Sequence, residues 1–392
     1  MKKLIAIVMI LYFCSTAFLN SVSASNMIEE GDDSKVSAIS LDIKAKSAVL
    51  MEAKTGKILY EQNSKESLPP ASITKIMTLL LVMEALDEGK IKETDLVTIS
   101  DYASSMGGSQ VFLAVGEQLT VRELLKCTVI ASANDAAVAL AEYTYGSEKA
   151  FVEAMNQRAK TLGLTGSSFE NVTGLDDTTV NHFATANDIA LMSRALINYP
   201  LIREFSSTWM DTIREGQFTL TNTNRLVRYY AGAIGLKTGS TEKAKFCLSA
   251  VAERDGMQLI AVVMGADTRD TRNSEAMRLL DYGFANYSVY EHIEENLKDL
   301  YVLKGEKDFV ELYADKFCVV IPKGKKDKVT YEISLPNSIY SGILRNDEVG
   351  TITYTLDDET IGIAKVRAKD SVETITFGKM LKKMLQSFLH LN

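Results

Sequence analysis

The sequence predicts an α/β (α+β) domain, in which an antiparallel sheet is combined with a helical subdomain, followed by a small β-rich domain. Three observations support this prediction. The stretch from Ser72 to Leu86 is too uniformly apolar for a surface helix and indicates a buried one. Apolar runs at 246–253 and 258–264 flank an Asp-Gly turn and predict a hairpin. After about residue 296, short alternating segments separated by charged turns predict further strands.

The elements of the first domain follow in order along the chain. Alternation on both sides of Lys54-Thr-Gly56 predicts a hairpin over 47–61, and Pro69-Pro70 ends the extended chain. Thr120-Val-Arg-Glu123 has the form of a capping box at a helix start. Helices are expected at 120–130, 136–143, 148–161, 185–197 and 273–286, and strands at 217–229 and 232–238. These elements place the first domain at 42–292.

The rest of the chain predicts a β-rich domain at 296–370 and a terminal helix at 375–392. The expected strands lie at 301–303, 317–321, 329–333, 349–354 and 360–366. In the terminal segment, apolar residues at helical spacing oppose lysines, as in a helix that lies in a membrane interface. This helix is too short to span a bilayer. Docking on the β-rich domain or on a partner is the alternative.

The N-terminus predicts an exported protein. Lys2 and Lys3 precede an apolar run from Leu4 to Leu19, and small residues follow at Val22-Ser-Ala24. This arrangement is typical of a secretory signal peptide at 1–24, joined by a polar linker at 25–41. A retained N-terminal anchor is the alternative.

Charge and composition exclude several classes of function. The 392 residues include 43 basic and 51 acidic ones, and removing two lysines with the signal peptide leaves a net charge near −10. A nucleic-acid partner is not expected, because phosphate binding needs a basic surface. Cys127, Cys247 and Cys318 are too widely separated to form a disulfide framework. The three histidines are far apart and are not spaced as metal ligands usually are, so no metal site is expected.

Three short motifs carry the chemistry: Ser72-Ile-Thr-Lys75, Ser132-Ala-Asn134 and Lys237-Thr-Gly239. A serine at a helix start lies near free backbone N–H groups and the positive end of the helix dipole. A lysine three residues later projects from the same face, and burial lowers its pKa so that it can act as a base. The same patterns recur at 240–243 and 54–56, but without the helix start or the motif order.

The order and spacing of these motifs form the signature of the penicillin-recognising serine enzymes. Over residues 40–290 the chain resembles the low-molecular-mass D-alanyl-D-alanine carboxypeptidases, which are penicillin-binding proteins with a β-lactamase-like catalytic domain. The segment Asn222–Tyr230 resembles the sporulation-associated members. The further matching segments are Pro69–Lys75, Ser132–Ala136, Phe169–Leu175, Thr185–Ile189 and Gly235–Gly239.

The resemblance implies three catalytic residues. Ser72 attacks the carbonyl between the last two D-alanines of a peptidoglycan stem peptide, and Lys75 receives its proton. Ser132 relays a proton towards the leaving amine. The backbone N–H groups of Ser72 and Ser240 form the oxyanion hole, which stabilises the negative charge that develops on the carbonyl oxygen.

The resemblance also implies the substrate-binding residues. Asn134 orients the catalytic lysine and binds the peptide amide. Lys237 and Thr238, followed by Gly239 and Ser240, lie along the substrate near its carboxylate. Arg272 helps to hold that carboxylate, because a guanidinium fork matches a carboxylate bidentately. No cofactor is implied. Phe169–Leu175 and His182 are expected to pack at the rim of the site without a chemical role.

Two rival functions fit parts of the same pattern. A serine β-lactamase would need a carboxylate that activates water. Glu170 could supply this carboxylate, but the segment that contains it matches the carboxypeptidases. Ser240 is a departure from that family, because several relatives carry a histidine or an aromatic residue at this position. A catalytically silent wall-binding protein would not need the polar motifs, which are intact. Endopeptidase activity on cross-links stays open. The sequence therefore predicts a serine carboxypeptidase that penicillins acylate and that associates with the membrane surface.

Overall fold

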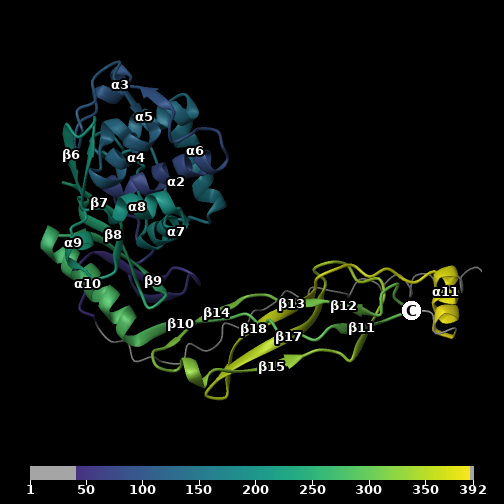
Figure 1. Cartoon of the computed structure of the whole chain (residues 1–392). Helices are drawn as coiled ribbons and strands as arrows, with labels where there is room; N and C mark the ends of the chain where they lie inside the picture. The colour runs from purple at the N-terminus through teal and green to yellow at the C-terminus, as the bar shows by residue number, and fades with distance from the viewer. Residues whose placement is uncertain (1–40, 389–392) are drawn as a thin grey trace, which may run out of the picture. The chain divides into compact units, whose positions relative to one another are not determined.

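The computed structural model describes residues 41–388 (Figure 1). The predicted signal peptide at 1–24 lies outside the described residues, as does nearly all of the predicted linker at 25–41. Of the predicted terminal helix, residues 389–392 also lie outside them.

A five-stranded antiparallel sheet in the order β2-β1-β9-β8-β7 organises the first domain. Both predicted hairpins are present, since β1 pairs with β2 and β8 pairs with β9. Lys54-Thr-Gly56 lies in the turn of the first hairpin, as its sequence predicted. The strands are β1 (Ser47–Glu52), β2 (Ile58–Gln62), β7 (Ala233–Thr241), β8 (Lys245–Arg254) and β9 (Met257–Ala266).

Helices cover both faces of this sheet. On one face, α10 (Arg269–Asn286) packs so closely that a Cβ at Gly283 would lie 2.4 Å from the Leu259 side chain. On the other face, Ser249 of β8 is hydrogen-bonded to Ser193 of α7 (Ala186–Leu196), with 2.7 Å between their hydroxyl oxygens. Alternate residues of a strand point to opposite faces, so both faces of the sheet are buried.

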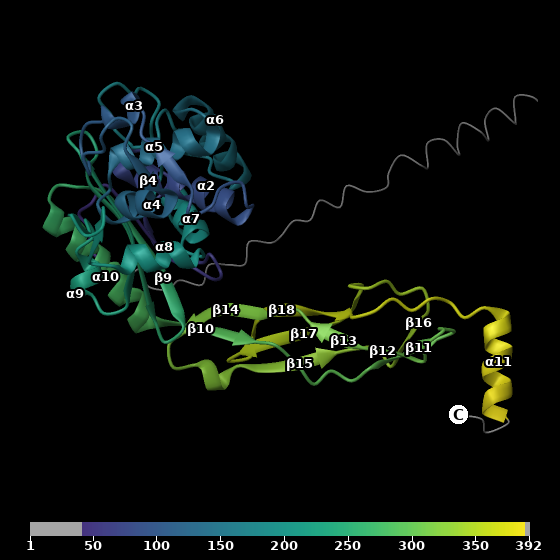
Figure 2. The ribbon, with the colours of Figure 1, turned by 45° about the horizontal axis from the view of Figure 1, so that its top comes forward.

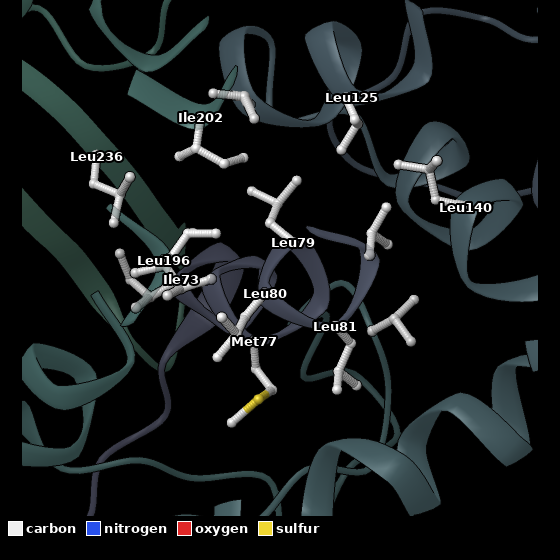
Figure 3. Packing of buried hydrophobic residues seen from close by; sticks show 14 of the residues in the cluster. Ile73, Met77, Leu79, Leu80, Leu81, Leu125, Leu140, Leu196, Ile202 and Leu236 are labelled. Carbon is white, nitrogen blue, oxygen red and sulfur yellow. The ribbon is translucent and has the colours of Figure 1, made fainter. Parts of the chain in front are cut away.

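The predicted apolar helix is the central helix α2 (Lys75–Asp87). It lies among α4, α5, α6 and α7 (Figures 1 and 2). Its apolar side chains point in several directions, and each meets apolar neighbours from other elements (Figure 3). A helix surrounded in this way needs apolar residues on every face, which explains its uniform composition. The α-helix begins only at Lys75, because the residues before it form a 3₁₀ turn, η1 (Ala71–Thr74).

The helical subdomain largely follows the predictions. The capping box is present, with Thr120 accepting from the backbone N–H of Glu123 and the Glu123 carboxylate accepting in return. The remaining elements before the sheet strand β7 are β3 (Leu96–Thr98), α3 (Asp101–Ser104), β4 (Gln118–Thr120), α4 (Val121–Ile130), α5 (Asn134–Tyr145), α6 (Glu148–Thr161), α8 (Pro200–Ser207), β5 (Met210–Ile213), β6 (Phe218–Thr221) and α9 (Leu226–Tyr229).

The strand expected at 217–229 is wrong in its second half, where the short helix α9 stands. The side-chain oxygen of Asn222 accepts from the backbone N–H of Asn224, and that of Asn224 accepts from Leu226. These local bonds turn the chain and take it out of the extended conformation. The alternating pattern of the segment did not reveal this turn chemistry.

The β-rich part has its own core, in which the rings of Phe317 and Tyr354 are stacked 3.8 Å apart. β10 (Tyr287–His292), which the sequence did not reveal, pairs with β14. The four-stranded sheet has the order β13-β18-β17-β15. The elements are β11 (Leu300–Leu303), β12 (Phe309–Val310), β13 (Leu312–Ala314), β14 (Phe317–Pro322), η2 (Lys326–Lys328), β15 (Thr330–Ser334), β16 (Ser338–Tyr340), β17 (Glu348–Leu356) and β18 (Glu359–Ala368).

The described part of the chain ends in α11 (Phe377–Phe388), which agrees with the predicted terminal helix. Its apolar side chains are exposed, and Phe388 retains 84% of its accessible surface. Among residues 41–388, no helix is long and apolar enough to cross a membrane.

Candidate active site

The first motif places a serine and a lysine in contact at the start of the central helix. Ser72 lies in η1, and the Lys75 Nζ atom lies 2.9 Å from its Oγ atom. Lys75 is fully buried. Burial lowers its pKa well below the ordinary value; the charge of Lys237 lowers it further, and the charge of Asp135 opposes the change.

Two further acceptors hold Lys75. Its Nζ atom donates to the side-chain oxygen of Asn134 at 2.5 Å and to the backbone carbonyl of Thr173 at 2.8 Å. A neutral amine has two protons and one lone pair, so these two acceptors use its protons and leave the lone pair for the Ser72 hydroxyl. The contacts of Lys75 therefore suit a base that removes the serine proton.

The second motif forms the turn between α4 and α5. Ser132 has φ of 62°, a left-handed conformation that is strained for a residue with a side chain. Its Oγ atom accepts from the Lys237 Nζ atom at 2.7 Å. Asn134 is the first residue of α5, and its side-chain Nδ2 atom donates to the Gly107 carbonyl at 2.6 Å. The turn thus directs both polar side chains of the motif towards the two lysines.

The third motif lies on strand β7. Burial lowers the pKa of Lys237 to about 7, with the charge of Arg272 as the second cause. Thr238 donates its hydroxyl to Thr223 at 2.8 Å, a partner that the sequence did not reveal. A Cβ at Gly239 would lie 2.8 Å from the Pro70 carbonyl oxygen, so only glycine lets β7 run this close to η1. Ser240 follows as an exposed residue of the same strand.

Arg272 lies in the first turn of α10 and lines a cavity of about 560 Å³ together with Ser72, Ser132 and Thr238. Its guanidinium is almost fully buried and donates twice to the side-chain oxygen of Asn273, at 2.8 and 3.1 Å. Burial lowers its pKa to about 10, with repulsion from Arg269 as the next cause. The structure thus brings all of the predicted site residues to one region.

The loop that follows α6 lies against η1, although the sequence predicted only packing for Phe169–Leu175. The Thr173 carbonyl is an acceptor for Lys75, and Gly174 follows with φ of 82°. A Cβ at Gly174 would lie 1.8 Å from the Ala71 carbonyl oxygen. Sequence reasoning missed Thr173 because a backbone carbonyl leaves no side-chain signal, but the following glycine marks the close approach.

His182 connects this loop to η1. Its Nδ1 atom accepts from the backbone N–H of Glu170 at 3.0 Å, and its Nε2 atom lies 2.7 Å from the Thr74 hydroxyl. That hydroxyl donates to the Ala71 carbonyl, so it can only accept from His182. These contacts fit a neutral ring with its proton on Nε2. Burial lowers the pKa of His182 to about 4.

We expect His182 to make folding sensitive to acid. Its folded pKa of about 4 lies below the ordinary 6.5, so the stability it contributes is complete above pH 6.5 and is lost as the pH falls towards 4. The shift corresponds to about 3 kcal/mol at most. Urea unfolding at pH 7 and pH 4 should therefore show a smaller acid-induced loss of unfolding free energy in His182→Gln than in the wild type. Equal losses would contradict this role.

A serine that contacts a buried lysine, beside a second serine and a Lys-Thr-Gly strand, defines the class of penicillin-recognising serine enzymes. Residues 33–268 match the family model described as D-alanyl-D-alanine carboxypeptidase. Residues 284–374 match the model described as penicillin-binding protein 5, C-terminal domain. The chain belongs to the D-alanyl-D-alanine carboxypeptidase family of serine peptidases.

Individual relatives agree with this family. The chain is 44% identical, over 87% of its length and 89% of the relative's, to the D-alanyl-D-alanine carboxypeptidase DacF of Bacillus subtilis. Its fold matches the crystal structure of penicillin binding protein 5 from Haemophilus influenzae, with a TM-score of 0.75 and 33% identity over 84% of this chain and 98% of the other. It also matches penicillin-binding protein D2 of Listeria monocytogenes in its ampicillin-bound form, with a TM-score of 0.57 and 32% identity over 61% and 97% of the two chains.

Proposed function

We propose that the protein removes the terminal D-alanine from peptidoglycan stem peptides through an acyl-enzyme on Ser72. The contact between the Lys75 Nζ atom and the Ser72 Oγ atom, at 2.9 Å in a buried site, is the observation that carries this proposal. Its use in cell wall maturation, including that of the spore cortex, is supported by the resemblance of Asn222–Tyr230 to sporulation-associated members.

In the first step, the Ser72 oxygen attacks the carbonyl carbon between the two D-alanines while Lys75 takes the hydroxyl proton. The backbone N–H groups of Ser72 and Ser240 stabilise the oxyanion, and each such donor contributes a factor of roughly 10²–10³ in rate. The C–N bond then breaks, and the proton that Lys75 took passes through the hydroxyl of Ser132 to the leaving amine, which leaves Lys75 neutral again. Lys237 holds that hydroxyl at 2.7 Å.

In the second step, water attacks the ester and gives a proton to Lys75, which returns a proton to the Ser72 oxygen as the ester breaks. The terminal carboxylate of the substrate binds near Thr238 and Arg272. No cofactor takes part in this scheme. A penicillin presents a strained amide carbonyl and a carboxylate in a similar arrangement, so it acylates Ser72 in the same way.

The test of this function uses the chain from residue 25 and a pentapeptide ending in D-Ala-D-Ala. We expect release of free D-alanine, together with an intact-mass adduct after penicillin treatment that maps to the peptide containing Ser72. An adduct on another residue, or neither release nor adduct, would reject the proposal.

We also propose that the protein is exported and binds the outer face of the cytoplasmic membrane through α11. The exposed apolar side chains of this helix support the proposal, with Lys382 on the opposite side to meet anionic headgroups. Lys379 and Lys383 lie on that side too, but they pair with Glu306 and Asp308. A helix docked on another protein would expose the same residues, so the test must measure lipid binding itself.

We expect Leu385→Asp to weaken co-flotation with vesicles that contain anionic lipid by about tenfold or more, because a buried leucine side chain contributes roughly 2 kcal/mol. Gln386→Asp is the matched control, since it adds the same charge on the lysine side of the helix. Equal effects of the two variants, or no flotation of the wild type, would contradict the membrane anchor.

A further inference from the structure

Four arginine side chains line the cavity in front of Ser72, and within residues 41–388 none of them forms an ion pair with a carboxylate. They are Arg225, Arg228, Arg269 and Arg272. Most other arginines of the chain are neutralised by a carboxylate within 3.6 Å: Arg122, Arg158, Arg203, Arg214, Arg254 and Arg367. The protein carries a net charge of −8, so the uncompensated positive charge is a local property of this cavity.

The backbone adds to this positive charge. Arg269 is the first residue of the 18-residue helix α10, directly after its N-cap Thr268. Helix N-termini carry partial positive charge and disfavour cations in the first turn. Arg269 and Arg272 both occupy that unfavourable position, and Asp270 is the one acid of the turn.

The guanidiniums of Arg225 and Arg269 are each close enough to Arg272 to repel it. Both Arg225 and Arg269 contribute to the lowered pKa of Arg272, while Asp270 acts in the opposite direction. Arg228 is different, because its guanidinium lies over the rings of Trp209 and Tyr229, 5.4 Å from each ring centre. Among the residues that the structure describes, Arg225 and Arg269 have no ring partner of this kind, and both are exposed and line the cavity.

One leaving D-alanine does not satisfy this arrangement. It brings a single carboxylate, which one guanidinium can bind bidentately. Arg272 takes that role in the proposed function, which leaves Arg225 and Arg269 without a counter-charge. The cavity volume of about 560 Å³ lies in the range of sites for larger ligands, so there is room beyond one alanine residue.

We propose that Arg225 and Arg269 form a second anion subsite, which accepts a leaving residue that carries a carboxylate in addition to that of the scissile D-amino acid. The proposal rests on the proposed roles of Ser72 and Arg272. In peptidoglycan, a leaving group of this kind occurs at a cross-link, where the leaving amine belongs to a second stem peptide with carboxylates of its own. The substrate class thereby extends from free pentapeptides to cross-linked ones.

The test uses three peptides with the same acyl part, diacetyl-L-Lys-D-Ala, and the leaving residues D-Ala, D-Glu and D-Gln. D-Gln matches D-Glu in size and lacks only the second charge. We expect kcat/KM for D-Glu to exceed that for D-Gln by about tenfold in the wild type at low salt, and the ratio to fall as salt screens the charges. Arg225→Gln and Arg269→Gln should each bring the ratio towards one.

Arg345→Gln is the control, because it removes an equal charge from a residue of the β-rich domain that does not line the cavity. It should keep the wild-type ratio. A wild-type ratio of one, with D-alanine still released, would overturn the second subsite and leave the proposed function standing. A ratio that survives both arginine substitutions would also overturn it. Failure to cleave any of the peptides, with no penicillin adduct, would instead count against the proposed function.

Discussion

Ser72→Ala should abolish measurable release of D-alanine and covalent labelling by penicillin. Without the hydroxyl no ester can form, and removal of a nucleophile that acts with its base costs on the order of 10⁴–10⁶ in rate. The base cannot compensate, because the Lys75 Nζ atom would face a methyl group in place of the oxygen at 2.9 Å. An end-point assay with the pentapeptide measures the release of D-alanine, and intact-mass analysis after penicillin treatment measures the covalent labelling.

This variant should fold normally. Ser72 is only half-buried, and its side chain does not cap the following helix. We therefore expect an unchanged circular dichroism spectrum and a Tm within a few degrees of the wild type. Retained peptide binding without turnover would support the assignment further. Residual acylation at another serine, such as Ser132 or Ser240, would show that the nucleophile lies elsewhere.

The sequence predicted the central helix and the two hairpins of the catalytic domain for identifiable reasons. The uniform hydrophobicity of 75–87 reports burial on all sides, and the Asp-Gly turn between β8 and β9 fixes a tight connection. The start of the helix was less well predicted. Ser72 occupies a 3₁₀ turn, which has the same residue preferences as a first helical turn and differs only in its hydrogen bonds.

The site residues were predictable where the chemistry resides in side chains. Lys75, Asn134 and Lys237 are polar residues in apolar or helical surroundings, and such residues need a partner when they are buried. The pairs Lys75–Asn134 and Lys237–Ser132 lie 59 and 105 residues apart along the chain. Only the family resemblance brought them together before the structure did.

Contacts that depend on the backbone or on local turns were not predictable. The Thr173 carbonyl reaches Lys75 because Gly174 has no side chain to collide with Ala71. His182 was expected only to pack, yet both of its ring nitrogens have partners, one on each of two segments that meet at the site. A single histidine in a sequence shows neither its tautomer nor its neighbours.

Lys75→Met should reduce acylation by about 10²–10⁴-fold while Ser72 remains in place. The expected loss is the usual contribution of a positioned general base. Methionine is similar in length and suits a buried position, but it leaves Asn134 and the Thr173 carbonyl without their donor, which costs roughly 1–3 kcal/mol for each group. The acylation rate constant with a chromogenic penicillin should therefore be measured below the Tm of the variant.

The pH dependence of acylation distinguishes a base from a merely structural lysine. If Lys75 must be neutral to act, the wild-type acylation rate rises with pH through the pKa of Lys75. This rising limb of the pH–rate profile disappears in Lys75→Met. The charge of Lys237 lowers the Lys75 pKa and that of Asp135 raises it. Lys237→Gln should therefore move the limb to higher pH, and Asp135→Asn should move it to lower pH. Shifts in the same direction, or a limb that persists in Lys75→Met, would assign the proton transfer to another group.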